Sequence, residues 1–179
     1  WGQKIGKDMY PVLGGPAVYL YEVDGTTFYS NIKASLTYND GVYEIDSAEE
    51  LLLFAEMVNG GQTAINAKLM ANIALNGIDW TMMDSFAGTF DGDGHTISGL
   101  NGHKAYIQNT HGFIRTLASG GVVKNLTFTE ADIWNHEGSG AISAVIVYTN
   151  NGTVENCMVK NSLIQLQYDT LGVVVGKNI

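Results

Sequence analysis

The spacing of apolar and polar residues predicts one amphipathic helix near residue 50. Apolar residues recur there at positions i, i+3, i+4 and i+7 and form a single stripe, made of Leu51, Phe54, Ala55 and Val58. Ser47 can cap the first backbone amides, and Glu50 completes an S-x-x-E capping box. Asn59-Gly60-Gly61 supplies a residue able to take the left-handed conformation that ends a helix. We therefore expect a helix at about residues 47–58, whose apolar face needs a neighbouring element.

Short strands are predicted on both sides of this helix. Before it, β-branched and aromatic runs at residues 18–23 and 26–29 flank Asp24-Gly25, a dipeptide suited to the positive φ angles of a type I′ hairpin turn. A polar break at residues 38–41 precedes a strand at residues 42–45. After the helix, apolar residues recur with the period of two that is typical of a strand, at Ala67, Leu69, Ala71, Ile73 and Leu75.

The second half of the chain contains an internal repeat. Residues 121–133 align with residues 152–164 at an offset of 31. The aligned pairs have similar character: Val123 with Val154, Asn125 with Asn156, Leu126 with Cys157, Phe128 with Val159 and Ile133 with Ile164. A weaker copy at residues 94–100 is expected at an offset of 26, with Ile97 over Val123 and Leu100 over Leu126. A second series of apolar runs has spacings of 28 and 32 and begins at Gly112, Gly140 and Gly172.

Strand repeats of this length with Gly-rich turns indicate a solenoid. We predict a mostly β fold, a short right-handed parallel β-helix at residues 32–179 whose coils stack at about 4.8 Å. We expect residues 1–31 to form a hairpin extension before it, whose segments at 1–6 and 10–13 resemble the end of a preceding β-helical unit. Because open strand edges promote association, the predicted helix is expected to cap the amino-terminal end. No equivalent cap follows residues 176–179, so we expect that end to be either a truncation or an open carboxyl-terminal surface that associates with the next segment, a partner or a crystal neighbour.

Composition and charge exclude several classes of protein. A hydrophobic share of 45% is too high for a disordered chain, and 22 Gly with two Pro lack the period of collagen. Nine Lys and Arg against 18 Asp and Glu leave a net charge of −9 without a clustered basic face, which argues against nucleic acid. No run approaches about 18 apolar residues, so no membrane span is expected. Since the chain begins at Trp1 without an initiator Met, we expect a piece of a longer precursor.

Asp91 and Asp93 are the residues that best fit a metal site. The two carboxylates alternate with Gly92 and Gly94, a pattern that could bind calcium. The longer D-x-[DN]-x-[DN]-G loop with a distant Glu is absent. The structural interpretation is therefore favoured: Asp91 caps local amides, and the glycines, Gly94 included, make the turn. We expect no cofactor, with calcium at Asp91 and Asp93 as the open alternative.

The remaining chemistry-bearing residues favour structural roles. No histidine pair has the i, i+4 spacing of a helical metal site among His95, His103, His111 and His136. Acidic residues are scattered without forming a column, at Glu130, Asp132, Glu137, Glu155 and Asp169. Cys157, the single cysteine, aligns with Leu126 and is interpreted as a buried small hydrophobe, while Asn125 and Asn156 are expected to form an asparagine ladder at a corner.

Two loops, at residues 101–111 and 134–139, are the expected places for ligand binding. Trp134 stands in a polar stretch with His136 and is the aromatic residue best placed for exposure. We therefore take Trp134 and His136 as the candidate ligand-binding residues. A sugar-stacking surface made in part of other aromatic residues is the alternative to a purely structural exterior.

Residues 88–100, GTFDGDGHTISGL, resemble the GLUG-motif repeats of bacterial cell-surface proteins. Three further segments of the chain are similar to shorter elements of the same repeat, namely GFIR at 112–115, VKNL at 123–126 and VENC at 154–157. Three positions depart from the family pattern, namely Asp93, Arg115 and Ala144. The resemblance implies a surface-exposed or secreted β-helical module with GLUG-like coils at 88–179, often one of several in a large protein. Related repeats occur in immunoglobulin-cleaving peptidases outside the catalytic domain, and the family has no common catalytic residues.

The expected function is a non-catalytic structural or adhesive module of a bacterial surface or secreted protein. The alternative is a carbohydrate-active β-helix that binds glycans or cleaves polysaccharides. Expected partners are a host matrix protein or a glycan, together with neighbouring domains of a longer chain. Acids gathered with an Arg in one exterior groove would favour the enzyme, and exposed coplanar aromatic residues would favour glycan binding.

Overall fold

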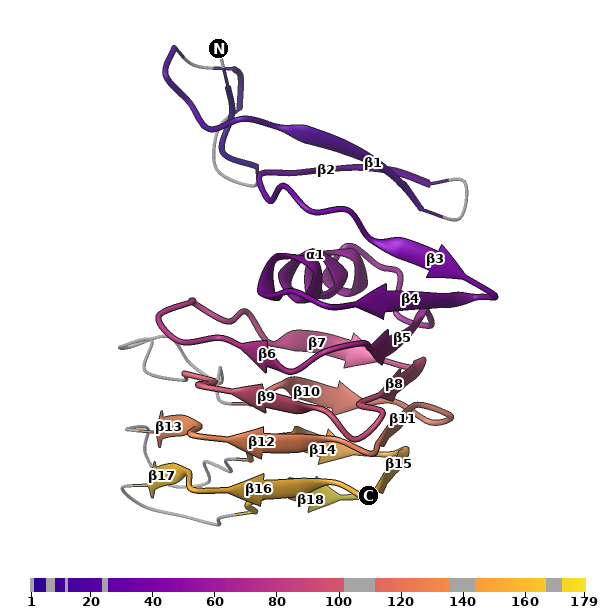
Figure 1. Cartoon of the computed structure of the whole chain (residues 1–179), viewed down its shortest axis with the longest axis vertical. Helices are drawn as coiled ribbons and strands as arrows, with labels where there is room; N and C mark the ends of the chain where they lie inside the picture. Colours follow the sequence, from indigo (N-terminus) through magenta and orange to yellow (C-terminus); the bar gives the residue numbers. More distant parts are fainter. Residues whose placement is uncertain are drawn as a thin grey trace.

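The computed structural model is mostly β, as the sequence predicts, with one helix in the described part of the chain (Figure 1). The described residues are 2–5, 9–11, 13–23, 26–101, 112–135, 144–166 and 172–179. A hairpin lies at the amino-terminal end, the helix follows it, and layers of short strands extend from the helix toward the carboxyl terminus.

Two hairpins open the structure. Strands β1 (Tyr19–Val23) and β2 (Thr26–Ser30) pair antiparallel, which confirms the predicted hairpin, although its turn at 24–25 lies outside the described residues. Strands β3 (Thr37–Asn39) and β4 (Val42–Ile45) form a second antiparallel pair, where the sequence indicated only a polar break before a strand. Asp40-Gly41 joins them with φ angles of 48° and 82°, the positive values that an Asp-Gly hairpin turn requires.

The predicted helix is confirmed as α1 (Ala48–Asn59). Ser47 caps its first turn, because the Ser47 Oγ accepts a hydrogen bond from the Glu50 N–H at 3.4 Å. The Glu50 carboxylate reaches back past the cap and accepts from the N–H of Asp46 at 2.8 Å. The side chains of Ser47 and Glu50 thus satisfy two amides around the start of the helix. No helix in the described residues is long and apolar enough to cross a membrane.

Three sheets hold most of the remaining strands. The first sheet contains, in spatial order, β15 (Thr153–Glu155), β11 (Val122–Lys124), β8 (Thr89–Asp91), β5 (Asn66–Leu69), β4 and β3. The second sheet contains β16 (Met158–Lys160), β12 (Thr127–Thr129), β9 (Thr96–Ser98) and β6 (Ile73–Ala74). The third sheet contains β18 (Val175–Asn178), β14 (Val147–Asn150), β10 (Ile114–Leu117) and β7 (Met83–Phe86). A parallel pair, β13 (Asp132–Asn135) and β17 (Leu163–Leu166), follows the second sheet.

The chain runs through the three sheets repeatedly, and each run, here called a passage, adds parallel strands to these sheets in a fixed order. Strands β10, β11, β12 and β13 follow one another along the chain and pair with β14, β15, β16 and β17 of the next passage. The registers confirm the 31-residue repeat, since the Cα partners are Val123 with Val154, Phe128 with Val159 and Ile133 with Ile164. Inward residues therefore stack on inward residues from one passage to the next.

The predicted register of the weaker repeat copy is wrong. Ile97 pairs with Phe128 rather than Val123, and the partner of Val123 in that passage is Phe90. The reason is a difference in turn length. Four residues, 92–95, join β8 to β9, whereas two residues, 125–126, join β11 to β12. An alignment that started from the glycine before Ile97 therefore matched β9 with the wrong strand.

The spacing predicted for the second series is also wrong. Ile114 pairs with Val147, and Val147 pairs with Val175, so the spacings are 33 and 28. Backbone hydrogen bonds from Phe113 and Ile114 run to the carbonyls of Val145 and Ile146. The buried run at residues 144–147 thus takes the place expected for the run after Gly140, which lies outside the described residues. Strand pairing follows the buried apolar run and not the glycine in front of it.

Aromatic rings form a continuous column through the core. Phe54 of α1 lies 6.0 Å from Phe90, Phe90 lies 5.1 Å from Phe113, and Phe113 lies 5.2 Å from Phe128, measured between ring centroids. Trp80 stacks on Phe113 at 4.9 Å. The helix therefore contributes one ring to the column and covers the core at its amino-terminal end (Figure 1).

The opposite end of the core is less covered. The inward residues of the last complete passage are partly buried, namely Val154, Cys157, Val159 and Ile164. Their counterparts one passage earlier are fully buried, namely Val123, Leu126, Phe128 and Ile133. The inward side chains are therefore less buried at the side of the stack that is formed by β15, β16, β17 and β18.

Candidate functional site

The corner between the first and second sheets gathers most of the residues that the sequence singled out. Asn125 and Asn156 occupy equivalent turns there with φ angles of 53° and 50°, and Asp93 has a φ of 48° in the longer turn above them. Asn and Asp tolerate this left-handed conformation because their short side chains bond to nearby groups. Gly94 follows with a φ of 82°, a value that would strain any residue with a side chain.

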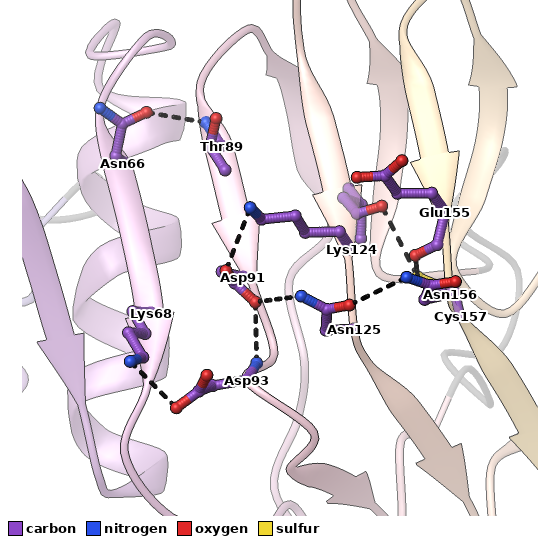
Figure 2. A network of polar contacts seen from close by, with 11 residues as sticks. Asn66, Lys68, Thr89, Asp91, Asp93, Lys124, Asn125, Glu155, Asn156 and Cys157 are labelled. Atoms are coloured by element: carbon purple, nitrogen blue, oxygen red, sulfur yellow. Dashed lines mark hydrogen bonds and ion pairs between the residues drawn. The ribbon is translucent and has the colours of Figure 1, made fainter.

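Three side chains at this corner form an amide ladder, defined as Asp91, Asn125 and Asn156 (Figure 2). The Asn156 Nδ2 donates to the Asn125 Oδ1 at 3.2 Å, and the Asn125 Nδ2 donates to the Asp91 Oδ1 at 3.0 Å. The same Asp91 oxygen accepts the Asp93 N–H at 2.9 Å, so Asp91 caps a local amide. The ladder links three consecutive passages through their side chains.

Five charged residues form a second column on the outer face of the first sheet, which we call the charge ladder. Strand register places Glu44 beside Lys68, Lys68 beside Asp91, Asp91 beside Lys124, and Lys124 beside Glu155. The sign of the charge therefore alternates at every step across β4, β5, β8, β11 and β15. Opposite charges directly across a strand pair stabilise a sheet, whereas like charges destabilise it.

Two lysines form ion pairs with the aspartate carboxylates in this region. The Lys124 Nζ lies 3.3 Å from the Asp91 Oδ2, and the Lys68 Nζ lies 3.0 Å from the Asp93 Oδ2 (Figure 2). Ion pairing with Asp93 raises the pKa of Lys68. Burial opposes ionisation of Asp91, but the Asn125 amide, the Asp93 N–H and Lys124 outweigh it, so the pKa of Asp91 lies below its usual value. The Asp91 carboxylate is therefore held as an anion by protein donors.

The calcium alternative at Asp91 and Asp93 would require displacement of both lysines. Within the described residues, no group of three or more His, Cys, Asp and Glu side chains is close enough to hold a metal ion. The arrangement is that of a polar support for the turn between β8 and β9, with Asp91 shared between the two ladders. Sequence reasoning missed the charge ladder because its alignment placed Ser98, not Asp91, beside Lys124.

Cys157 directly follows Asn156 of the amide ladder in the sequence. Its Sγ is 3.2 Å from the carbonyl oxygen of Glu155 and 3.6 Å from that of Val123, so the thiol donates to the backbone. Burial raises the pKa of the Cys157 thiol. A thiol with little thiolate is a poor nucleophile, and the position in the apolar column matches that of Leu126 in the previous passage.

The predicted ligand-binding residues fall largely outside the described part of the chain. Trp134 belongs to β13, where its backbone pairs with Gln165, but its side chain and His136 are not among the described residues. The same holds for residues 102–111 and 136–143. Of the scattered acids, Asp132 lies beside Leu163, as the repeat predicts. In the described strands these acids form no purely acidic column, since Glu155 belongs to the charge ladder and pairs in register with Lys124.

A groove that the sequence did not reveal lies between the hairpin β1–β2 and α1. Its volume is about 750 Å³, and residues lining it include Phe28, Tyr29, Ile32, Glu56 and Asp79. Tyr29 is 58% exposed, and the Ser30 hydroxyl donates to the Glu56 carboxylate. The groove exists only because the hairpin docks on the helix, where Ser30 and its partner Glu56 are 26 residues apart in sequence, a contact that no local pattern shows.

Comparison with known proteins identifies similar chains without placing this one in a family. No protein-family profile matches the sequence. The chain is 29% identical over 167 residues to Halomucin from Haloquadratum walsbyi, in an alignment that covers 86% of this chain and 2% of Halomucin. It is similar to the crystal structure of a proposed immunoglobulin A1 protease from Bacteroides ovatus, with a TM-score of 0.58 and 18% identity. That match covers 76% of this chain and 42% of the other, and at this identity it shows a shared fold alone.

Proposed function

We propose that this chain is a non-catalytic structural module of a secreted or cell-surface protein, built as a right-handed parallel β-helix with α1 as its cap. The observation that carries the proposal is the in-register pairing of successive passages in three sheets. Parallel connections within a sheet are right-handed in about 98% of cases, which supports the handedness. Such a stack is a rigid spacer, because each passage is fixed to the next along every sheet.

The outer face of the first sheet supports a structural role. The charges of the ladder alternate, Asp91 and Asp93 are each paired with a lysine, and the amide ladder satisfies side-chain donors between passages. Polar groups whose hydrogen bonds and charges are satisfied by one another are not free to bind or activate a substrate. Among the described residues, the exterior Arg115 pairs with one acid, Asp84, at 3.2 Å, whereas a polysaccharide-cleaving enzyme is expected to gather several acids with an Arg in one groove.

The extracellular setting rests on resemblance. The stretch GTFDGDGHTISGL at 88–100 resembles repeats of bacterial cell-surface proteins, and the chain is similar to a segment of Halomucin. The partners proposed on this basis are neighbouring domains of a longer protein and a matrix protein or glycan at the loops 101–111 and 134–139.

The spacer role can be tested by measuring rigidity and cleavage together. Spin labels at Glu49→Cys in α1 and Lys160→Cys in β16, both exposed sites, are placed in a Cys157→Val background. We expect one narrow distance distribution between the labels. The unlabelled chain is also incubated with soluble polysaccharides and with immunoglobulin A1, which we expect to remain intact. A broad distribution would contradict the rigid spacer, and cleavage would contradict the absence of catalysis.

The groove between the hairpin and α1 favours a second candidate, glycan binding. The exposed ring of Tyr29 and the acidic Glu56 line the same concave site, and recognition sites combine apolar faces with a few polar groups. The test is binding to a glycan array. Tyr29→Ala should abolish any binding, while Tyr38→Ala, which removes an equally exposed tyrosine outside this groove, should not. Equal effects of the two variants would exclude the groove.

A further inference from the structure

The two antiparallel hairpins each carry a cross-strand pair of aromatic side chains. In the first hairpin, Tyr21 of β1 and Phe28 of β2 are register partners, and their stacked rings have centroids 5.3 Å apart. In the second hairpin, Tyr38 of β3 and Tyr43 of β4 are register partners, with centroids 4.6 Å apart. Each pair flanks an Asp-Gly dipeptide in the sequence. Two separate hairpins therefore present the same arrangement of rings.

A pocket with a volume of about 250 Å³ is lined by all four of these aromatic residues. The lining is completed by Met57 of α1, by the segment 34–36 and by Glu22. The two hairpins that contribute the rings follow one another at the amino-terminal end of the stack (Figure 1). The pocket is distinct from the groove beside Tyr29, although Phe28 lines both.

The aromatic residues of the pocket are held in place by other contacts. The Tyr21 hydroxyl donates to the carbonyl oxygen of Ile32 at 2.8 Å and accepts the Ala34 N–H at 3.0 Å. The Tyr43 side chain is 5% exposed, and its ring centroid lies 6.2 Å from that of Phe54 in the core. A ligand would therefore have to order few side chains in this pocket, and such preorganisation favours affinity.

The lining of the pocket favours an organic cation. A ring face attracts a cation that lies within about 6 Å of its centroid, and sites made of several rings recognise quaternary ammonium groups. Among the described residues that line the pocket there is no Lys, Arg or His. Glu22 carries the formal charge of the lining, which is negative, and it forms no ion pair with a described residue. Since pockets for drug-sized ligands have volumes of about 300–1,000 Å³, this smaller pocket suits a compact headgroup.

We propose that this pocket binds a small quaternary ammonium compound of the choline class, with its methyl groups against the four rings. Tyr38 is 58% exposed, so its ring is accessible to a ligand from solvent. Burial of the methyl groups and cation–π attraction would supply the affinity. A cation that carries its own carboxylate would bind less well, because Glu22 gives the lining a negative charge. The inference rests on the two ring pairs and is independent of whether the module is a spacer or binds glycans.

A purely structural role for the ring pairs predicts a different result. Cross-strand aromatic pairs stabilise hairpins by themselves. Substitution of a ring would then change stability, but no ligand would bind. An apolar pocket without cation–π attraction would bind a cation no more tightly than a neutral molecule of the same shape. Matched charged and neutral probes therefore separate these alternatives.

The probes are choline and its neutral carbon isostere, in which a tert-butyl group replaces the trimethylammonium group. The 179-residue chain is titrated into each probe, and proton NMR follows the methyl resonance, which moves upfield over an aromatic ring. We expect choline to bind about tenfold more tightly than the isostere, because cation–π attraction adds to the burial that both probes share. Glycine betaine, which carries a carboxylate, should bind more weakly than choline.

Two exposed tyrosines provide a matched pair of variants. Tyr38→Leu keeps an apolar side chain but removes one ring of the pocket, so it should weaken choline binding about fivefold and change binding of the isostere little. Tyr38→Phe retains the ring and should bind choline as tightly as the unaltered chain. Tyr29→Leu removes an equally exposed ring outside this pocket and should leave choline binding unchanged. Circular dichroism checks that the variants fold.

Three results would overturn the proposal. The first is the absence of saturable choline binding at millimolar concentration. The second is equal affinity for choline and its isostere, which would show an apolar pocket that does not recognise the charge. The third is an equal loss of choline binding in Tyr29→Leu and Tyr38→Leu, which would contradict the assignment of the ligand to this pocket.

Discussion

At the scale of single residues, Asp91 connects the two polar columns of the molecule. One of its oxygens accepts from Asn125 and from the Asp93 N–H, and the other pairs with Lys124. Charge-assisted hydrogen bonds of this kind are the stronger ones, and Asp91 is less exposed than Asp93. Identical side chains two positions apart therefore have different energetic roles.

Replacement of Asp91 by Asn is expected to lower the free energy of unfolding by about 1 kcal/mol at pH 7, because Lys124 and the two donors lose their anion. The pKa of Asp91 is lower in the folded chain, so its contribution is complete above the ordinary aspartate value of about 3.9 and declines as the pH falls below it. Denaturant titrations at pH 7 and pH 3 measure both. Asp93→Asn, at a more exposed pair, should change stability by less than about 0.5 kcal/mol; an equal or larger loss would contradict this ranking.

Cys157 is expected to react slowly with a disulfide reagent. Because burial raises the pKa of its thiol, little thiolate is present at pH 8, and the folded chain should react at least about tenfold more slowly than the chain in denaturant. Absorbance of the released thiolate measures both rates. A folded chain that reacts as fast as the unfolded one would show that Cys157 is an accessible nucleophile.

At the scale of elements, short sequence signals were reliable wherever the structure is local. The capping residues and apolar stripe located α1, and the apolar runs located β1 and β2. Asp40-Gly41 carries the same turn signal as Asp24-Gly25, so the hairpin β3–β4 could also be predicted from the sequence, although the polar residues 38–41 indicated only a break before a strand. The register of β9 was not readable, because it depends on a turn two residues longer than its counterparts.

Loss of the helix cap should weaken the whole stack. Ser47→Ala removes the acceptor of the Glu50 N–H and is expected to lower the free energy of unfolding by about 1 kcal/mol, since α1 covers the end of the core. Ser35→Ala, at an exposed position, should change it by less than about 0.5 kcal/mol. Urea denaturation followed by circular dichroism compares them. Equal stability of the two variants would mean that the cap does not contribute.

At the scale of the whole molecule, the aromatic column joins elements that are far apart in sequence. Phe54 from the helix and Phe128 from a late strand belong to one line of rings. The packing of each ring depends on the passages before and after it, so the stack should unfold as a unit.

The contribution of the aromatic column to stability can be tested by substituting two adjacent residues whose side chains point to opposite faces of the strand. Phe128→Ala removes a fully buried ring and should cost about 3–5 kcal/mol, whereas Thr127→Ala, on the outer face, should cost less than about 0.5 kcal/mol. Guanidinium denaturation gives both values from one transition. If Thr127→Ala were the more damaging, the assignment of inner and outer faces would be wrong.

The order of residues alone was enough to identify the helix, the first hairpin, the mostly β class and the pairing of 121–133 with 152–164. These features depend on period, capping and turn chemistry, which act within a few residues or repeat at a constant offset. Tertiary structure decided the register of β8 and β9, the alternation of charge from Glu44 to Glu155 and the groove beside Tyr29. The groove depends on how the hairpin docks on α1, through a contact between residues 26 positions apart. The register and the charge alternation depend on which passages lie side by side, and unequal turn lengths remove that information from any fixed repeat.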